Sequence, residues 1–318
     1  MNPSDPKTSF LYLAPIQGVT DALFRKVFHH HFGGFDVAIA PFINPQRHSA
    51  AKEKWLSDVL PENNPGLPII PQLLNTDVED FIALALRLQD LGYTHINWNL
   101  GCPVPMVAKK ERGSGLLPYP EKIVTLLEKI MPRLKIELSI KTRLGYYQTQ
   151  EILTLLPLLD AFPLKEIVIH ARLGKQLYRG GVDLDGFALC REHSRHTLVY
   201  NGDITNVATF TMLTGRFPWV NRWMIGRGVV ADPFLALSLR GKASSTQDRL
   251  KKLKEFHTDL YHGYSRRLSG PGHLLGRMKQ LWIYLIASFP DKQKILKKIK
   301  RATKEQHYLQ AIAELFSE

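Results

Sequence analysis

The chain has 318 residues, of which 44% are hydrophobic and 22% charged, a composition typical of a soluble globular protein without low-complexity tracts. Its longest apolar run, at 281–289, is too short to cross a bilayer, and its polar start lacks the apolar core of a signal peptide, so we expect a cytoplasmic protein with no membrane partner. The formal net charge of +13 indicates a polyanionic partner, with nucleic acid the first candidate, although a solvated basic face that only aids solubility is an alternative.

Up to about residue 240, short apolar runs alternate with amphipathic helical stretches, a pattern typical of βα units around a parallel sheet. The predicted strands are 10–16, 35–42, 68–74, 95–101, 138–144, 166–172, 196–204 and 222–228. Helices are predicted between them, for example over 78–92, where apolar residues recur at intervals of three and four, and over 120–131, where Pro120 suits a first helical turn. Eight such units favour a closed (β/α)8 TIM barrel over an open doubly wound sheet.

From about residue 241 this alternation stops, and several helical stretches follow, separated by Gly, Pro and Ser. We therefore predict two domains, a barrel over 1–240 and an all-helical domain over 241–318. Between Arg240 and Glu318 there are 17 Lys/Arg and 7 Asp/Glu, so a formal charge of +10 lies in this last quarter of the chain. The basic run at 292–300 is either a solvated helix face or a surface for a phosphate backbone.

Polar residues gather at or just after the carboxyl-terminal ends of the predicted strands. They are Gln17, Gln72, Asn99, Lys141, Arg143, His170, Arg172, Asn201, Asp203 and Arg227. Any one of them would be explained by contact with solvent, but barrel enzymes build their sites on this face, and the whole set predicts an active site there.

Cys102 lies in the stretch NLGCP, where Gly101 and Pro103 predict a tight loop that holds the sulfur over the barrel mouth. A free thiol with an ordinary pKa of ~8.5 is mostly protonated at neutral pH, which favours a general acid over a resting nucleophile. The glycine-containing stretch 104–115 has the length of a lid. The alternative for a lone cysteine is a small buried hydrophobe, and this is our interpretation of Cys190.

Two glycine-containing clusters, 200–204 and 225–228, follow the last two predicted strands, the place where barrels recurrently bind phosphate. As a pair they predict a phosphorylated cofactor. Lys141 and His170 on the two preceding strands suit contacts to a flavin ring or its phosphate. Taken singly, His170 also fits a hydrogen-bonded core histidine and Lys141 a side chain that extends to solvent.

No metal is expected. Two cysteines without CxxC or Cys/His spacing argue against structural zinc. The three histidines at 29–31 would point about 100° apart on a helix and could not share one ion. Gly33 and Gly34, which follow these histidines, predict a helix stop at this point.

Seven stretches together resemble the successive motifs of the tRNA-dihydrouridine synthases. They are 13–25, 71–77, 99–121, 140–145, 169–187, 201–204 and 225–228, in the family's order and at similar spacings. The blocks at 99–121 and 169–187 are specific, because few other barrels carry both. The basic helical end also resembles the family's tRNA-binding domain.

This resemblance implies an FMN enzyme that reduces the uracil C5–C6 double bond of particular uridines in tRNA, with NADPH supplying electrons. It implies that Cys102 gives a proton to C5 while the flavin gives a hydride to C6, on a uridine that has left its stack. The residues implied for the base are Asn99, Arg143 and Tyr178. Those implied for the flavin are Pro15, Ile16, Gln17, Gln72, Lys141 and His170, and those implied for its ribityl-phosphate end are Asn201, Gly202, Asp203, Gly226 and Arg227.

Two departures and two rival functions stay open at this stage. Pro105 stands where the family commonly has Lys after the Gly-Cys-Pro turn, and the second predicted strand ends in APF at 40–42.

The rival functions are an FMN barrel reductase for a small molecule, similar to dihydroorotate dehydrogenase, and a non-catalytic RNA-binding protein on a degenerate barrel. The basic helical end disfavours the first, and intact site residues disfavour the second. A monomer would suffice for the implied activity.

Overall fold

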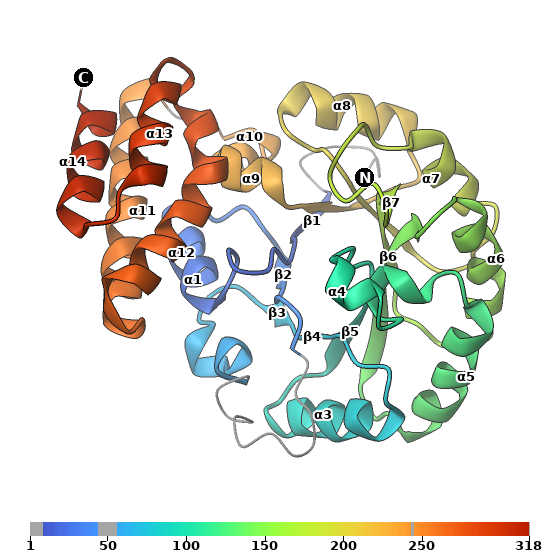
Figure 1. Cartoon of the computed structure of the whole chain (residues 1–318). Helices are drawn as coiled ribbons and strands as arrows, with labels where there is room; N and C mark the ends of the chain where they lie inside the picture. Colours follow the sequence, from blue (N-terminus) through green and yellow to red (C-terminus); the bar gives the residue numbers. More distant parts are fainter. Residues whose placement is uncertain (1–8, 44–55, 243–244, 318) are drawn as a thin grey trace.

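The computed structural model describes residues 9–43, 56–242 and 245–317. Within these residues, nine parallel strands form one sheet in the order β3-β2-β1-β9-β8-β7-β6-β5-β4 (Figure 1). The strands are β1 (Phe10–Leu13), β2 (Val37–Ile39), β3 (Ile69–Ile70), β4 (Gln72–Leu73), β5 (His95–Leu100), β6 (Glu137–Gly145), β7 (Ile167–Leu173), β8 (Leu198–Asn201) and β9 (Arg222–Ile225). Each predicted strand is present, and the third is divided into β3 and β4.

Pro71 divides that strand and also marks where the sheet closes. A proline has no N–H to give to a ladder, but the Pro71 carbonyl still accepts a hydrogen bond from Asn97 N at 2.9 Å. β3 pairs with β2, and β4 pairs with β5. Ile43 N, just beyond β2, donates to Gln72 O in β4 at 2.8 Å. The two ends of the sheet therefore meet at one strand position, and the predicted eight-position TIM barrel is confirmed.

The barrel helices lie outside the strands, except for α4, which lies over the middle of the ring of strands in this view (Figure 1). They are α1 (Ala22–His31), α3 (Val78–Asp90), α4 (Pro105–Ala108), α5 (Pro120–Ile130), α6 (Gln150–Leu159), α7 (Leu184–Cys190), α8 (Val207–Arg216), α9 (Arg227–Ala231) and α10 (Leu235–Leu239). Pro120 occupies the first turn of α5, as predicted. α1 ends at His31, and Gly33 and Gly34 follow with φ of +62° and +85°, which confirms the predicted helix stop.

The last two predicted strands were drawn too long at their carboxyl ends. β8 stops at Asn201, because Gly202 and Asp203 follow with φ of +148° and +31°, outside the strand region. β9 stops at Ile225, and Arg227 already begins α9. Both glycine-containing clusters are therefore loops and a helix start rather than strand ends.

The sheet has apolar side chains on both faces. Because successive side chains of a strand point to opposite faces, Leu11 and Leu13 pack outward against the helices while Tyr12 points into the barrel. The Tyr12 hydroxyl donates to Glu166 Oε2 at 2.7 Å and accepts from Arg222 Nη1 at 2.7 Å. Tyr12 and Glu166 are buried and Arg222 is partly exposed, and the three side chains lie in the barrel interior near the amino-terminal ends of β7 and β9. The barrel is thus packed at that end.

Beyond residue 240 the described chain is helical. The elements are α11 (Thr246–Arg267), α12 (Gly270–Leu285), η5 (Ile286–Ser288), η6 (Pro290–Lys292), α13 (Gln293–Arg301) and α14 (Glu305–Phe316). Tyr308 ties three of them together: its hydroxyl accepts from Trp282 Nε1 at 2.9 Å and lies 2.7 Å from His257 Nε2. Burial lowers the pKa of His257 to about 3, so this imidazole is neutral. Its Nε2 can then accept a hydrogen bond from the Tyr308 hydroxyl. In the described part of the chain no helix combines the length and the apolarity needed to cross a membrane.

The helices α11–α14 lie together beside α1, α9 and α10 (Figure 1). The Phe256 ring of α11 packs edge-on against Phe24 and Phe28 of α1 and against Phe32 directly after it, with ring centroids 5.9, 6.1 and 5.1 Å away. Tyr264, also in α11, donates its hydroxyl proton to Asp21 Oδ1 at 2.7 Å. Asp21 caps the start of α1, so the joint between barrel and helices lies next to the β1–α1 loop.

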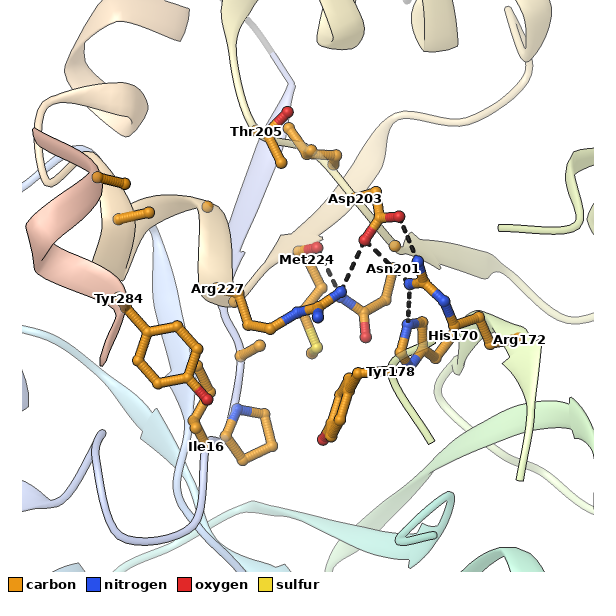
Figure 2. A pocket seen from close by; sticks show the side chains of 18 of the residues that line it. Ile16, His170, Arg172, Tyr178, Asn201, Asp203, Thr205, Met224, Arg227 and Tyr284 are labelled. Atoms are coloured by element: carbon orange, nitrogen blue, oxygen red, sulfur yellow. Dashed lines mark hydrogen bonds and ion pairs between the residues drawn. The ribbon is translucent and has the colours of Figure 1, made fainter. Parts of the chain in front are cut away.

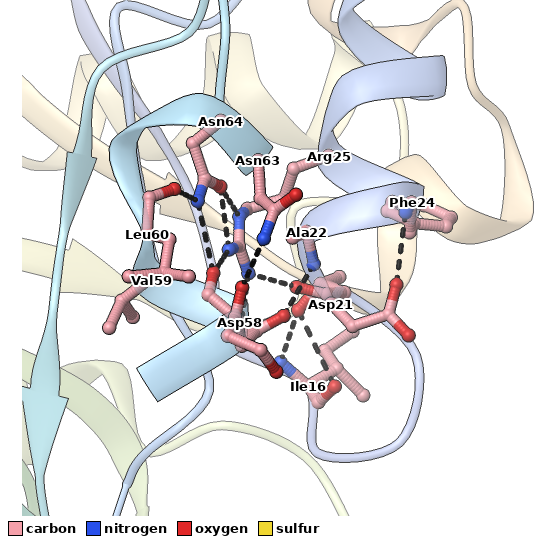
Figure 3. A network of polar contacts seen from close by, with 12 residues as sticks. Ile16, Asp21, Ala22, Phe24, Arg25, Asp58, Val59, Leu60, Asn63 and Asn64 are labelled. Carbon is pink, nitrogen blue, oxygen red and sulfur yellow. Dashed lines mark hydrogen bonds and ion pairs between the residues drawn. The ribbon is translucent and has the colours of Figure 1, made fainter. Parts of the chain in front are cut away.

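A buried guanidinium fixes this loop (Figure 3). Arg25, which is 1% exposed, donates from Nη1 to Thr20 O at 2.7 Å and to Asp58 Oδ2 at 3.1 Å. Asn64 Oδ1 accepts from Nη2 at 2.7 Å and from Nε at 3.1 Å. The Thr20 hydroxyl in turn accepts from Ile16 N at 2.8 Å. The conformation of the loop after β1 therefore depends on Arg25.

Replacing Arg25 by Met should lower the free energy of unfolding by about 3 kcal/mol, because Asp58 loses its cation and buried carbonyl and amide groups lose their donor. Urea unfolding measures this loss. Arg133→Met is the matched control, because Arg133 and its partner Glu79 are 45% and 51% exposed, and solvent screens this surface pair so that its loss should change stability far less than the loss of Arg25. Equal losses in the two variants would contradict the assigned role of Arg25.

Candidate active site

A cavity of about 550 Å³ lies at the carboxyl-terminal mouth of the barrel (Figure 2). This volume is within the range of about 300–1,000 Å³ typical of cofactor and ligand sites. The predicted site residues that line it are Pro15, Ile16, Lys141, His170, Tyr178, Asn201, Gly202, Asp203, Gly226 and Arg227. Five strands or strand ends, those of β1, β6, β7, β8 and β9, thus bring together side chains up to 212 positions apart in the sequence.

Asp203 organises the cationic side of the cavity (Figure 2). Arg172 Nη1 and Arg227 Nη2 donate to Asp203 Oδ1 at 2.9 and 2.8 Å, and Arg172 Nη2 also bonds to Oδ2. Burial by itself would raise the pKa of Asp203, but the hydrogen bonds and charges of Arg172 and Arg227 outweigh it and lower that pKa. Asp203 is therefore a carboxylate at neutral pH, and both of its oxygens are used to hold arginines.

His170 is a neutral imidazole with a free donor. Burial, and then the positive charges of Arg143, Lys141 and Arg172, lower the pKa of His170 well below its usual value. Arg172 Nη1 lies 3.2 Å from His170 Nε2, so Nε2 accepts and the ring proton sits on Nδ1. Within the described residues Nδ1–H has no partner, and it remains available for a ligand in the cavity.

Lys141 lines the same cavity from β6. Burial, and then the charge of Arg143, lower the pKa of Lys141 to about 7, with a small opposing effect from Cys102. In the part of the chain that the structure describes, no carboxylate pairs with Lys141. The side-chain amine of Lys141 is therefore only partly protonated at neutral pH in the absence of an anion in the cavity.

Cys102 is buried, 9% exposed, in a turn held from two sides. Asn99 Oδ1 accepts from Gly101 N at 3.0 Å and from Cys102 N at 2.8 Å. Arg143 Nε donates to Gly101 O at 3.0 Å, and Ser114 N and Oγ both donate to Cys102 O at 3.0 Å. The predicted tight loop around the thiol is present, and its conformation is fixed by these side chains.

The pKa of Cys102 stays above its ordinary value. Burial raises it, while a backbone hydrogen bond at Val104 and the charges of Arg143 and Lys141 act in the opposite direction. The side chain is therefore a neutral thiol at pH 7, able to donate a proton. Lys141 is the link to the cavity, because it lines that space and its charge acts on the thiol.

The other predicted site residues lie outside the cavity lining: Gln17, Gln72, Asn99, Cys102 and Arg143. Gln17 lies in the loop after β1 and is exposed. Gln72 is fully buried, donates to Asn97 Oδ1 at 2.7 Å and accepts from Asn99 Nδ2 at 2.8 Å. Arg143, 1% exposed, also donates from Nη1 to the carbonyls of Leu173 and Leu177 at 2.8 and 2.6 Å. These three buried side chains are mostly bonded to the protein itself.

Tyr178 stands at the edge of the cavity and is 54% exposed. Its ring centroid is 4.8 Å from Arg227 Cζ and 5.2 Å from Arg143 Cζ, and the His170 ring is 6.1 Å away (Figure 2). An exposed aromatic ring next to guanidinium groups offers a face on which a nucleobase can stack.

The lid region begins with the departure at Pro105. Val104 has an extended backbone, and Pro105 starts the short helix α4, a position where the missing N–H costs nothing. Gly113 follows with φ of +55°, and a Cβ placed on it would lie 2.7 Å from Cys102 O. The far end of the lid region therefore packs directly on the Cys102 turn.

Several residues that line the cavity were not among the site residues predicted from the sequence. Arg172 stood among the polar strand-end residues, which was the signal for it, but it was given no ligand role. Ile283, Tyr284 and Ala287 also line the cavity, from α12 and η5. The sequence carries no signal for these three, because the run at 281–289 has the composition of an ordinary buried helix.

Two other predictions concern residues outside the cavity. Cys190 is fully buried in α7, its Sγ donates to Gly186 O at 3.2 Å, and burial raises the pKa of Cys190 to about 12, so the prediction of a buried hydrophobe is confirmed. The histidines that end α1 have separate surroundings. His31 Nε2 lies 2.7 Å from Asp259 Oδ2 of α11, while the His29 ring packs next to Gly66.

Comparison with known proteins gives one consistent result. The sequence model of the family described as "Dihydrouridine synthase (Dus)" matches residues 12–316. The tRNA-dihydrouridine(16) synthase of Cupriavidus necator is 30% identical to this chain over 308 residues, which cover 92% of this chain and 93% of that protein. The probable tRNA-dihydrouridine synthase 2 of Bacillus subtilis is 29% identical over 281 residues, which cover 86% and 85%.

A solved structure agrees in fold. Morphinone reductase superimposes with a TM-score of 0.52 at 14% sequence identity, and the match covers 75% of this chain and 88% of that one. At this identity the likeness shows the barrel fold alone. Since the family match extends over nearly the whole chain, barrel and helical end together, the chain belongs to the dihydrouridine synthase family.

Proposed function

We propose that the chain is a flavin-dependent tRNA-dihydrouridine synthase, which reduces the C5–C6 double bond of uridines in tRNA. The observation that carries this proposal is the cavity at the barrel mouth, where cationic side chains and a neutral imidazole face a space of cofactor size, next to a protonated thiol. Family membership and the names of the relatives support the substrate class.

The cavity residues fit FMN. Lys141, Arg172 and Arg227 line the cavity together with a single carboxylate, that of Asp203, so the cavity has more positive than negative charge and suits an anion. Arg172 Nε is buried and has no hydrogen-bond partner among the described residues. Pro15 and Ile16 supply an apolar wall for a ring system. FMN combines these two needs, an apolar ring and a charged phosphate.

We infer distinct roles for the residues that would hold FMN. Lys141 and the Nδ1–H of His170 would meet the ring, and Asn201, Gly202 and Arg227 would meet the ribityl-phosphate end. Asp203 would orient Arg172 and Arg227 rather than contact the phosphate, because two carboxylate oxygens already bonded to arginines would repel another anion. When bound and reduced, with NADPH as the expected electron donor, the flavin supplies a hydride to uracil C6.

Cys102 would give the proton that C5 requires. A general acid must hold its proton until it is needed, and the raised pKa of Cys102 keeps the thiol neutral. Asn99 and Arg143 would act mainly as positioning residues, since Asn99 Oδ1 and Arg143 Nε fix the Cys102 turn. Asn99 Nδ2 donates one hydrogen bond to Gln72, and its second N–H, which has no protein partner among the described residues, is available to the base.

The helical end would bind the tRNA backbone. α13 buries Ile295 and Ile299 and presents Lys297, Lys300 and Arg301 to solvent. Exposed lysines at this spacing match the phosphates of a nucleic acid, whereas a small-molecule substrate needs no such surface. Tyr178 would stack on the unpaired base at the cavity edge.

Replacing Cys102 by Ala should lower the single-turnover rate of dihydrouridine formation by about 100-fold or more, because the acid is lost. Bound flavin should be unchanged, since Cys102 does not line the cavity. Rapid mixing of reduced enzyme with tRNA, together with flavin absorbance, measures both quantities. The control is Cys190→Ala, whose rate should match the wild type, and an undiminished rate in Cys102→Ala would refute the acid assignment.

FMN affinity should depend on pH through Lys141. With a pKa of about 7 in the free protein, Lys141 is charged below that pH, and an anionic ligand favours the charged form. Affinity should therefore fall as the pH rises from about 7.5 to about 9, by roughly tenfold, over a range in which the FMN phosphate stays doubly charged.

Fluorescence titration of the flavin-free protein checks this slope. Lys141→Gln should bind more weakly at about pH 7.5 and show a flat profile, because the titrating group is gone. A wild-type profile as flat as that of Lys141→Gln would contradict the proposed contact between Lys141 and the cofactor.

Binding to tRNA should weaken steeply with salt, and Lys297 with Lys300 should account for part of that slope. Neither lysine pairs with a carboxylate among the described residues, so changing both to Ala should reduce the slope of log affinity against log salt by roughly 1.5. Lys135→Ala, on the exposed loop before β6 at the opposite end of the barrel, is the control. No change in slope for the double variant would place the tRNA elsewhere.

A further inference from the structure

The helical end of the chain reaches the cofactor cavity. Three side chains from α12 and η5, those of Ile283, Tyr284 and Ala287, line the cavity together with barrel residues (Figure 2). Tyr284 lies on the opposite side from His170 and Arg172 in Figure 2, and its ring is directed toward the space between these two sides. The cavity is therefore bounded by both parts of the chain, and neither part forms it alone.

The side chains that α12 and η5 contribute to the cavity are not fully packed against other protein groups. Ile283 is 53% exposed, although it lies in the most apolar run of the chain. The Tyr284 hydroxyl makes no hydrogen bond to another described residue. Burial, and then the nearby Tyr178, raise the pKa of Tyr284, so this hydroxyl keeps its proton and is a donor. The wall thus presents apolar surface and an unused donor to whatever occupies the cavity.

Contacts on both sides hold this wall against the barrel. On one side, Arg277 of α12 donates from Nη1 to Gly18 O and lies 3.6 Å from Asp21 Oδ2. On the other side, Ser288 Oγ of η5 donates to Ala231 O at the end of α9, at 2.6 Å. The first contact is to the loop that carries Pro15 and Ile16, and the second is to the helix that begins with Arg227. α12 therefore spans two barrel elements that form the cavity.

We propose that the flavin cofactor is a shared ligand of the barrel and of α12–η5, so that binding it fastens the tRNA-binding helices to the barrel. This inference rests on the proposed function. Ile283 and Tyr284 contribute to cofactor affinity, and by linkage the bound cofactor stabilises the position of α12. The helical end is then part of the cofactor site as well as the carrier of positive charge.

The first experiment is an FMN titration of flavin-free full-length variants. Ile283→Ser should weaken FMN binding roughly fivefold, because a half-exposed apolar side chain no longer covers the ligand. Tyr284→Phe removes only the hydroxyl and should weaken binding roughly threefold to tenfold, because the cofactor loses this donor. The matched control is Leu309→Ser, an apolar helix residue of α14 that is 42% exposed and lies outside the cavity.

The second experiment measures amide hydrogen exchange of the wild-type chain with and without FMN. Exchange in α12 should slow on FMN addition, whereas exchange in α5, which lies on the far side of the barrel (Figure 1), should not change. The readout is independent of activity and of tRNA. It also applies where a substitution impairs folding.

The outcomes separate the inference from the function on which it rests. Weaker FMN binding by Ile283→Ser but not by Leu309→Ser, together with slower exchange in α12, would support the shared site. FMN binding that is equal in wild type and Ile283→Ser, with exchange in α12 unaffected, would overturn it while leaving the proposed flavoenzyme intact. A wild-type chain that does not bind FMN at all would overturn both.

Discussion

The site depends on an excess of positive charge in a cavity that contains one carboxylate. Asp203 holds Arg172 and Arg227 in place, and Lys141 stands in the same cavity without a carboxylate partner in the described structure. Burial, and then the repulsion between like charges, lowers the pKa of Lys141 to about 7 and the pKa of His170 well below its usual value. An anionic ligand relieves this repulsion, and the chemistry proposed for the mouth follows from that need.

The thiol is positioned by a separate set of contacts. Asn99, Arg143 and Ser114 hold the backbone around Cys102, and most of their hydrogen bonds are made to that backbone. The cavity and the acid are thus held by different sets of side chains, and Lys141 connects them. This division allows the thiol to remain protonated and fixed while the adjoining cavity is dominated by cations.

The helical end has two roles in this arrangement. Its outer surface carries exposed lysines, and its inner helix α12 contributes a wall of the cavity. The phenylalanine cluster around Phe256 and the Arg277 contact to Gly18 hold that helix against the β1–α1 loop. The barrel mouth is consequently completed by residues more than 260 positions away from the first loop.

The sequence by itself determined the barrel, the face that bears the site and most of the residues around the cavity. Strand and helix periodicity, glycine turns and the placement of polar residues at strand ends are local properties, and parallel strands necessarily bring their carboxyl ends to one side. The resemblance supplied the cofactor and substrate class. Tertiary structure alone decided that Asp203 binds Arg172 and Arg227, that Asn99 and Arg143 support the Cys102 turn, and that Tyr284 faces the cavity. Each of these depends on which side chains meet after the sheet closes at Pro71 and α12 packs on the barrel, and a helix pattern specifies an apolar face without specifying what that face meets.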